Sequence, residues 1–68
     1  SYAQQIVEGQ YLAFRMSHPA VRLPLMLGCR LVNGQVIFDQ LEYPNNQKAE
    51  AEYCNIAQHF INWLNLQA

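Results

Sequence analysis

Apolar side chains in the last third of the chain recur with a helical period. Between Gln47 and Leu66 there is neither Gly nor Pro, and apolar residues follow one another at spacings of three and four. Such a stripe predicts an amphipathic helix with one face on a core. Pro44 ends whatever precedes it, and Asn45 or Asn46 is expected to cap the N-terminus of the helix. The stripe consists of Ala49, Tyr53, Ile56, Ala57, Phe60, Trp63 and Leu64.

A β-hairpin is predicted around Asn33-Gly34. This pair favours a type I′ turn, which needs positive φ at both central residues, and its flanks are rich in β-branched and aromatic residues. A two-residue loop pairs Val32 with Gln35, and the register then follows outward along both strands. The residues expected on the core side are Leu27, Cys29, Leu31, Val36 and Phe38.

The N-terminal half contributes a further strand and an ambiguous segment. Residues 10–16 alternate as a strand, and residues 17–24 contain two prolines and are predicted to be a loop. Residues 2–8 would present a short helical face that ends at Gly9. The predicted fold class is therefore α+β, in the order α-β-β-β-α, with a three-stranded antiparallel sheet and its helices packed on one face.

Length and composition indicate a single small domain over residues 1–68. The 68 residues are 51% hydrophobic and 13% charged. A chain this short buries only about 60% of its unfolded surface, so another chain is expected to cover part of the apolar surface. The Ser-Tyr start without Met indicates a domain excised from a larger protein or a processed end. Free cysteines and the absence of a signal peptide or membrane segment favour an intracellular protein, cytoplasmic or nuclear.

Charge and residue spacing argue against several chemistries. The net charge is −1, and the four basic side chains are scattered, which is poor for phosphate binding. Cys29 is expected in the core, and Cys54 and His59 fall on different sides of one helix, so neither cysteine forms a nucleophilic site with His18 or His59. No pair of these residues has zinc-ligand spacing. We therefore expect no enzyme activity, metal, cofactor or small-molecule substrate.

The third predicted strand, residues 35–42, is a candidate interaction edge. One of its edges is unpaired, and it has neither the Lys nor the Pro that usually blunts an open edge. Ile37 and Leu41 are expected on the face away from the last helix. Strand addition with a partner or a second copy would hide them and would satisfy the backbone groups. The partner-binding residues expected here are Val36, Ile37, Asp39, Leu41 and Tyr43.

The order of elements resembles the double-stranded RNA-binding domain family. Tyr11-Leu12-Ala13-Phe14 is similar to its first strand, and Leu25 to Val36 to its second strand and turn. Asn45 to Glu50 stands at the start of the final helix. Ala49, Tyr53, Cys54 and Ala57 occupy helix positions that are small or apolar in that family. The resemblance implies RNA-facing positions at Gln4, Glu8, His18, Asn46, Gln47 and Lys48.

The departures from the family pattern lie where that family meets RNA. Asn46 and Gln47 stand where that family has paired lysines that meet phosphates, and Glu50 stands where it has a cation. Ser17-His18-Pro19 is only weakly similar to the loop that meets the minor groove in that family. The chain therefore resembles a degenerate member. This implies a protein-interaction or homodimerisation module of an RNA-processing or RNA-silencing protein. Two alternatives stay open: weak, shape-based binding of duplex RNA, and a small non-catalytic subunit or inhibitor of unrelated βββα fold.

Overall fold

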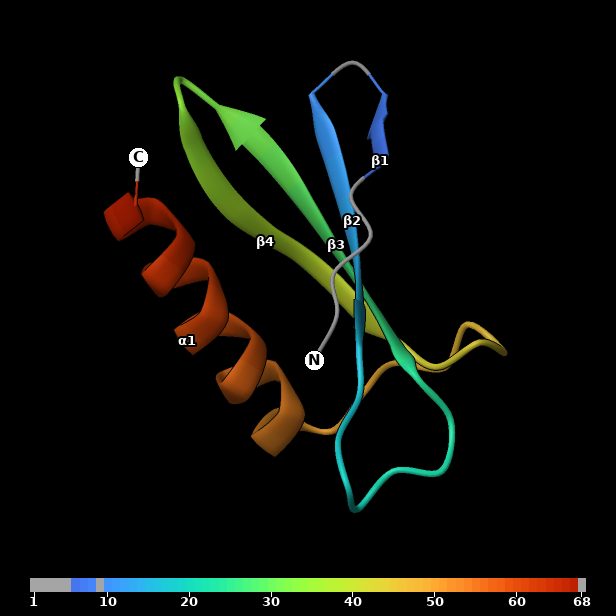
Figure 1. Cartoon of the computed structure of the whole chain (residues 1–68). Coiled ribbons are helices and arrows are strands. Elements are labelled where there is room, and N and C mark those ends of the chain that lie inside the picture. Colours follow the sequence, from blue (N-terminus) through green and yellow to red (C-terminus); the bar gives the residue numbers. More distant parts are fainter. Residues whose placement is uncertain (1–5, 9, 68) are drawn as a thin grey trace.

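The computed structural model describes residues 6–8 and 10–67, which form one antiparallel sheet and one helix (Figure 1). The sheet has four strands in the order β1-β2-β3-β4, so each strand pairs with its neighbour in the sequence. The elements are β1 (Ile6–Glu8), β2 (Tyr11–Met16), β3 (Leu25–Val32), β4 (Gln35–Glu42) and α1 (Ala51–Gln67).

The predicted run of three antiparallel strands followed by a C-terminal helix is confirmed by β2, β3, β4 and α1. Of the helix considered for residues 2–8, residues 2–5 lie outside the described residues. Ile6–Glu8 form the short strand β1, which pairs with β2 from Ile6 opposite Ala13 to Glu8 opposite Tyr11. The sheet therefore has one strand more than expected, at its N-terminal edge.

The hairpin between β3 and β4 has the predicted turn and register. Asn33 has φ 50° and Gly34 has φ 80°, as a type I′ turn requires. Val32 pairs with Gln35, Leu31 with Val36 and Cys29 with Phe38. The local turn chemistry thus sets the pairing over the first half of both strands.

A β-bulge in β4 changes the second half of the hairpin. Cys29 pairs with Phe38, but Gly28 pairs with Gln40, so Asp39 is an extra residue. One inserted residue reverses the inward and outward alternation beyond it. Leu41 therefore faces the core opposite Leu27 and is only 2% exposed. The prediction that Leu41 lies on the face away from the helix is wrong for this reason.

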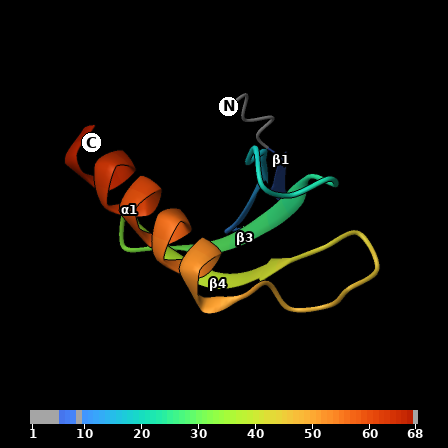
Figure 2. The same cartoon turned by 90° about the horizontal axis from the view of Figure 1, so that it is seen from below.

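The core lies between α1 and one face of the sheet (Figure 2). Tyr53, Ala57 and Ile61 form the buried side of the helix. Phe38 and Phe60 are half-buried and pack against this core. The strands contribute the buried side chains of Leu12, Phe14, Leu25, Leu27, Cys29 and Leu41.

The connection from β4 to α1 is built differently from the expectation. The Asn45 side chain accepts a hydrogen bond from the Gln47 N–H (3.1 Å), and Asn46 has φ 67°. Both asparagines thus shape a turn after Tyr43 and do not cap the helix, which begins later, at Ala51. Asx turns of this kind compete with helix formation, because the side chain takes a backbone donor that a helix would need.

Candidate functional site

The outer edge of β4 is covered at both ends by its own chain. At its C-terminal end, the Tyr43 N–H donates to the Gln47 carbonyl and the Ala49 N–H donates to the Leu41 carbonyl. The donor–acceptor distance is 2.9 Å in both bonds. These bonds make an antiparallel bridge between Glu42 and Lys48. The connection to α1 therefore acts as a short additional strand on this edge.

Asn65 of α1 covers the other end of the same edge. Its Oδ1 accepts a hydrogen bond from the Val36 N–H at 2.8 Å, and its Nδ2 donates to the Val36 carbonyl at 3.1 Å. One side-chain amide thus satisfies both outward backbone groups of Val36, as a neighbouring strand would. The stretch left between the two covers is short, Ile37 to Gln40, and it contains the bulge.

The predicted partner-binding residues consequently do not form an open docking edge. Val36 is bound by Asn65, Leu41 is buried, and the Tyr43 hydroxyl donates to Glu50 Oε1. Asp39 Oδ2 accepts a hydrogen bond from the Tyr11 hydroxyl at 3.0 Å. Of the predicted set, Ile37 alone offers an exposed apolar side chain, 39% exposed.

Most of the residues that the resemblance places at an RNA interface form contacts within the chain instead. His18 Nδ1 accepts from the Ala20 N–H (3.1 Å), and its ring packs edge-on against Tyr53, with centroids 5.1 Å apart. Lys48 forms an ion pair with Glu42 (3.3 Å). Asn46 and Gln47 belong to the β4–α1 connection described above. Gln4 lies outside the described residues, and Glu8 is placed only as backbone of β1.

The cysteines occupy different environments. Cys29 is buried, and burial raises the pKa of its thiol to about 11, with Asp39 adding to the shift. Cys54 is half-buried in the first turn of α1, and its Sγ donates to the Ala49 carbonyl at a distance of 3.7 Å. In the described part of the chain, no three His, Cys, Asp or Glu side chains gather as a metal site would require.

An exposed apolar surface runs along one side of α1. This aromatic flank consists of Ile56, Phe60, Trp63 and Leu66, of which Trp63 is 55% exposed and Leu66 81% exposed. Phe60 lies edge-to-face on the buried Phe14 at 5.3 Å and stacks on Trp63 at 6.3 Å. The three rings form a continuous path from the core to the surface.

The sequence contains a signal for this flank, although the predicted stripe places all of its residues on one core-facing side. Trp63 and the buried Ile61 are two positions apart, which places them about 160° apart around a helix, so they cannot both face the sheet. The apolar residues of α1 therefore span a wider arc around the helix than one face of a sheet can cover. The predicted stripe omits Ile61, which is buried, and includes Ile56 and Trp63, which are exposed.

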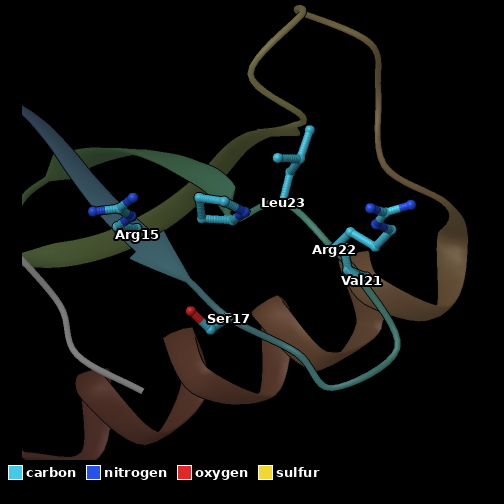
Figure 3. Close-up of a pocket in the computed structure, with 6 residues that line it drawn as sticks. Arg15, Ser17, Val21, Arg22 and Leu23 are labelled. Atoms are coloured by element: carbon cyan, nitrogen blue, oxygen red, sulfur yellow. The ribbon is translucent and has the colours of Figure 1, made fainter.

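A second feature is an open hollow beside the loop between β2 and β3 (Figure 3). Its volume is about 320 Å³. Figure 3 shows Arg15 and Arg22 at opposite sides of it, with Leu23 between them. The lining residues are Arg15, Ser17, Val21, Arg22, Leu23 and Pro24. These arginines are scattered in the sequence, and only the path of the loop brings them to one hollow.

Comparisons with known proteins add no relative. No protein-family model matches the chain, and neither characterised proteins nor solved structures give a significant match. Within the part of the chain that the structure describes, α1 is not long and apolar enough to cross a membrane. The aromatic flank and the basic hollow are therefore the features from which a function is inferred.

Proposed function

We propose that this domain is a non-catalytic protein-interaction module that pairs with a second copy of itself through the aromatic flank of α1. The observation that carries the proposal is Trp63, a large apolar side chain that is 55% exposed and stacked on Phe60. Because Phe60 is anchored on Phe14 in the core, the flank is held in place before binding. Tryptophan is among the residues most enriched in interface hot spots.

Charge favours a second copy as the occupant. The only charged residue of α1 is Glu52, in the first turn, and the helix has no Lys or Arg. When a twofold axis brings two such helices together antiparallel, the two Glu52 side chains lie at opposite ends and do not repel each other, and each flank presents the same apolar residues to the other. The flank offers a single formal charge, Glu52, one turn before Ile56, and this is too little to select a partner by opposite charge.

The available area predicts a reversible dimer. A typical stable interface removes about 800 Å² from each partner, and the whole chain has an accessible surface of 4917 Å². The flank is a single side of one helix with four apolar residues, so we expect an interface smaller than this and dimerisation that depends on concentration. Pairing through the edge of β4 is disfavoured, because Asn65 and the β4–α1 connection already satisfy the backbone groups at both ends of that edge.

The test is sedimentation equilibrium of the domain from micromolar to millimolar concentration. We expect the unmodified chain to form dimers and Trp63→Glu to remain monomeric, because a carboxylate cannot be buried unpaired in an apolar interface. Gln58→Glu introduces the same charge on the polar side of α1 and should leave dimerisation unchanged. Far-ultraviolet circular dichroism checks that both variants fold.

Three outcomes would contradict the proposal. They are a monomeric unmodified chain at millimolar concentration, a Trp63→Glu variant that dimerises as well as the unmodified chain, and a Gln58→Glu variant that loses dimerisation equally. A heterologous partner that depends on Trp63 would keep the surface but replace the second copy as its occupant.

The role in RNA processing or RNA silencing rests on the family resemblance alone. For duplex RNA we expect absent or very weak binding, since Lys48 is paired with Glu42 and His18 is engaged with Ala20 and Tyr53. A gel-shift assay at physiological salt with a duplex of about 16 base pairs tests this expectation. Sub-micromolar binding would contradict it and would favour the RNA-binding alternative.

A further inference from the structure

The hollow beside the β2–β3 loop combines a polar and an apolar lining. Arg15 and Ser17 come from the end of β2 and the residue after it, and Arg22 from the loop. Val21, Leu23 and Pro24 provide apolar surface next to these polar groups. Its volume, about 320 Å³, is near the lower end of the range for small-molecule sites.

Neither arginine is neutralised by a carboxylate in the described part of the chain. The one ion pair there joins Lys48 to Glu42. Asp39 is engaged by Tyr11, and Glu50 by Tyr43. Arg15 and Arg22 are both exposed. The hollow therefore carries two positive charges whose fork-shaped donors remain open to a ligand.

The loop that forms the hollow is held in place by local contacts. The Val21 N–H donates to the His18 carbonyl at 3.0 Å, and the Ala20 N–H donates to His18 Nδ1 at 3.1 Å. The His18 ring rests against Tyr53 of α1, and Val21 packs against the core. Because the loop is already tied to the helix and the core, little ordering is needed when a ligand binds.

We propose that this hollow binds a small organic anion, a carboxylate or phosphate group carried on a short apolar body. The side chains of Arg15 and Arg22 are exposed on opposite sides of the hollow (Figure 3), and both turn inward onto the oxyanion when it binds. The Ser17 hydroxyl donates a further hydrogen bond. Arginine matches the geometry of both carboxylate and phosphate through paired N–H donors. Leu23 and Pro24 contact the apolar body. This site is separate from the aromatic flank and does not depend on dimerisation.

The experiment is a titration followed by amide ¹H–¹⁵N NMR spectra, with phenyl phosphate and benzoate as separate ligands and inorganic phosphate as a head group without the apolar body. We expect saturable shifts in residues 17–24 with at least one of the two ring compounds. Saturation by phenyl phosphate alone identifies a phosphate ester, saturation by benzoate alone identifies a carboxylate, and saturation by both supports the general anion site.

Charge-matched variants separate the hollow from general attraction of anions. Arg15→Gln and Arg22→Gln should each weaken binding about tenfold, the loss expected for a charge-assisted hydrogen bond. Arg30→Gln removes the same charge from the exposed Arg30 of β3, outside the hollow, and should change the affinity less than about twofold. Arg22→Lys keeps the positive charge but loses the planar guanidinium with its paired N–H donors. Its affinity should lie between those of the unmodified chain and Arg22→Gln.

Several results would overturn the proposal. One is the absence of saturation by both ring compounds at millimolar concentration. Another is equal affinity for inorganic phosphate and the ring compounds, which would show that the apolar lining contributes nothing. A third is an Arg30→Gln variant that loses as much affinity as Arg22→Gln. If a glutamine variant fails to fold, unchanged binding by Arg22→Lys would count equally against the guanidinium role.

Discussion

The Tyr11 hydroxyl donates a hydrogen bond to Asp39 Oδ2 at 3.0 Å and so links β2 to β4 across the intervening strand. The ring passes over Gly28 of β3, where a Cβ atom would overlap the hydroxyl and come within 2.8 Å of the ring carbon Cζ. Asp39 is the extra residue of the β4 bulge. The pKa of Tyr11 is raised by burial first and by Asp39 second. The pair thus joins three strands on the sheet face opposite α1.

Gly28→Ala should destabilise the domain by about 1–3 kcal/mol, the usual cost of overpacking. The added methyl group displaces the Tyr11 ring and breaks its bond to Asp39. Urea unfolding measures the loss. Combining Gly28→Ala with Tyr11→Val should restore part of the stability, since the smaller side chain leaves room. Tyr11→Phe removes the closest contact, the hydroxyl, but keeps the ring carbon Cζ within 2.8 Å, and should restore less. Additive effects of Gly28→Ala and Tyr11→Val would contradict this coupling.

Asn65→Ala should cost about 1–3 kcal/mol of stability, because the N–H and C=O groups of Val36 lose their partner. The matched control is Asn62→Ala on the same helix, whose side chain only accepts an exposed hydrogen bond from Gln58. We expect a change below about 0.5 kcal/mol for this control. The exposed edge should also make the Asn65→Ala variant more prone to aggregation, measured by light scattering. Equal stability losses in the two variants would refute the bridging role of Asn65.

The two thiols should differ in reactivity. At pH 8 a disulfide reagent such as Ellman's reagent should modify Cys54 well before Cys29, because Cys29 is buried and burial raises its pKa to about 11. Cys54→Ser should abolish the fast phase, and Cys29→Ser should preserve it. The slow phase should accelerate as the pH approaches that raised pKa. A fast phase that survives Cys54→Ser would show that Cys29 is accessible.

Tyr43 should titrate well above an ordinary tyrosine. Its hydrogen bond to Glu50 raises the pKa of Tyr43 to about 12 and lowers the pKa of Glu50. Because the folded-state pKa of Tyr43 is the higher one, its contribution to stability is complete below pH 10 and is lost as the pH rises to about 12. Absorbance at alkaline pH should show that Glu50→Gln lowers this pKa strongly. Glu52→Gln, which removes a weaker influence, should lower it little; equal effects would exclude the hydrogen bond as the main cause.

The sequence predicted most of the architecture. Asn33-Gly34 was sufficient for the turn and for the register as far as Phe38, because a type I′ turn requires a backbone conformation that few residue pairs adopt. The bulge at Asp39 was not predicted. It has no local composition signal here, and its Asp39 side chain meets Tyr11, a residue 28 positions away. The inward orientation of Leu41 follows from that bulge.

The sequence by itself determined the local conformations: the three predicted strands, the tight turn and the amphipathic helix, since these depend on φ/ψ preferences and on periods of two and 3.6 residues. The tertiary structure decided which apolar side of α1 is buried, because burial depends on where the sheet lies. It also decided that Asn65 covers the edge at Val36 and that Arg15 and Arg22 share one hollow. Each of these relations joins residues through the path of a loop or connection, and local preferences carry no information about that path.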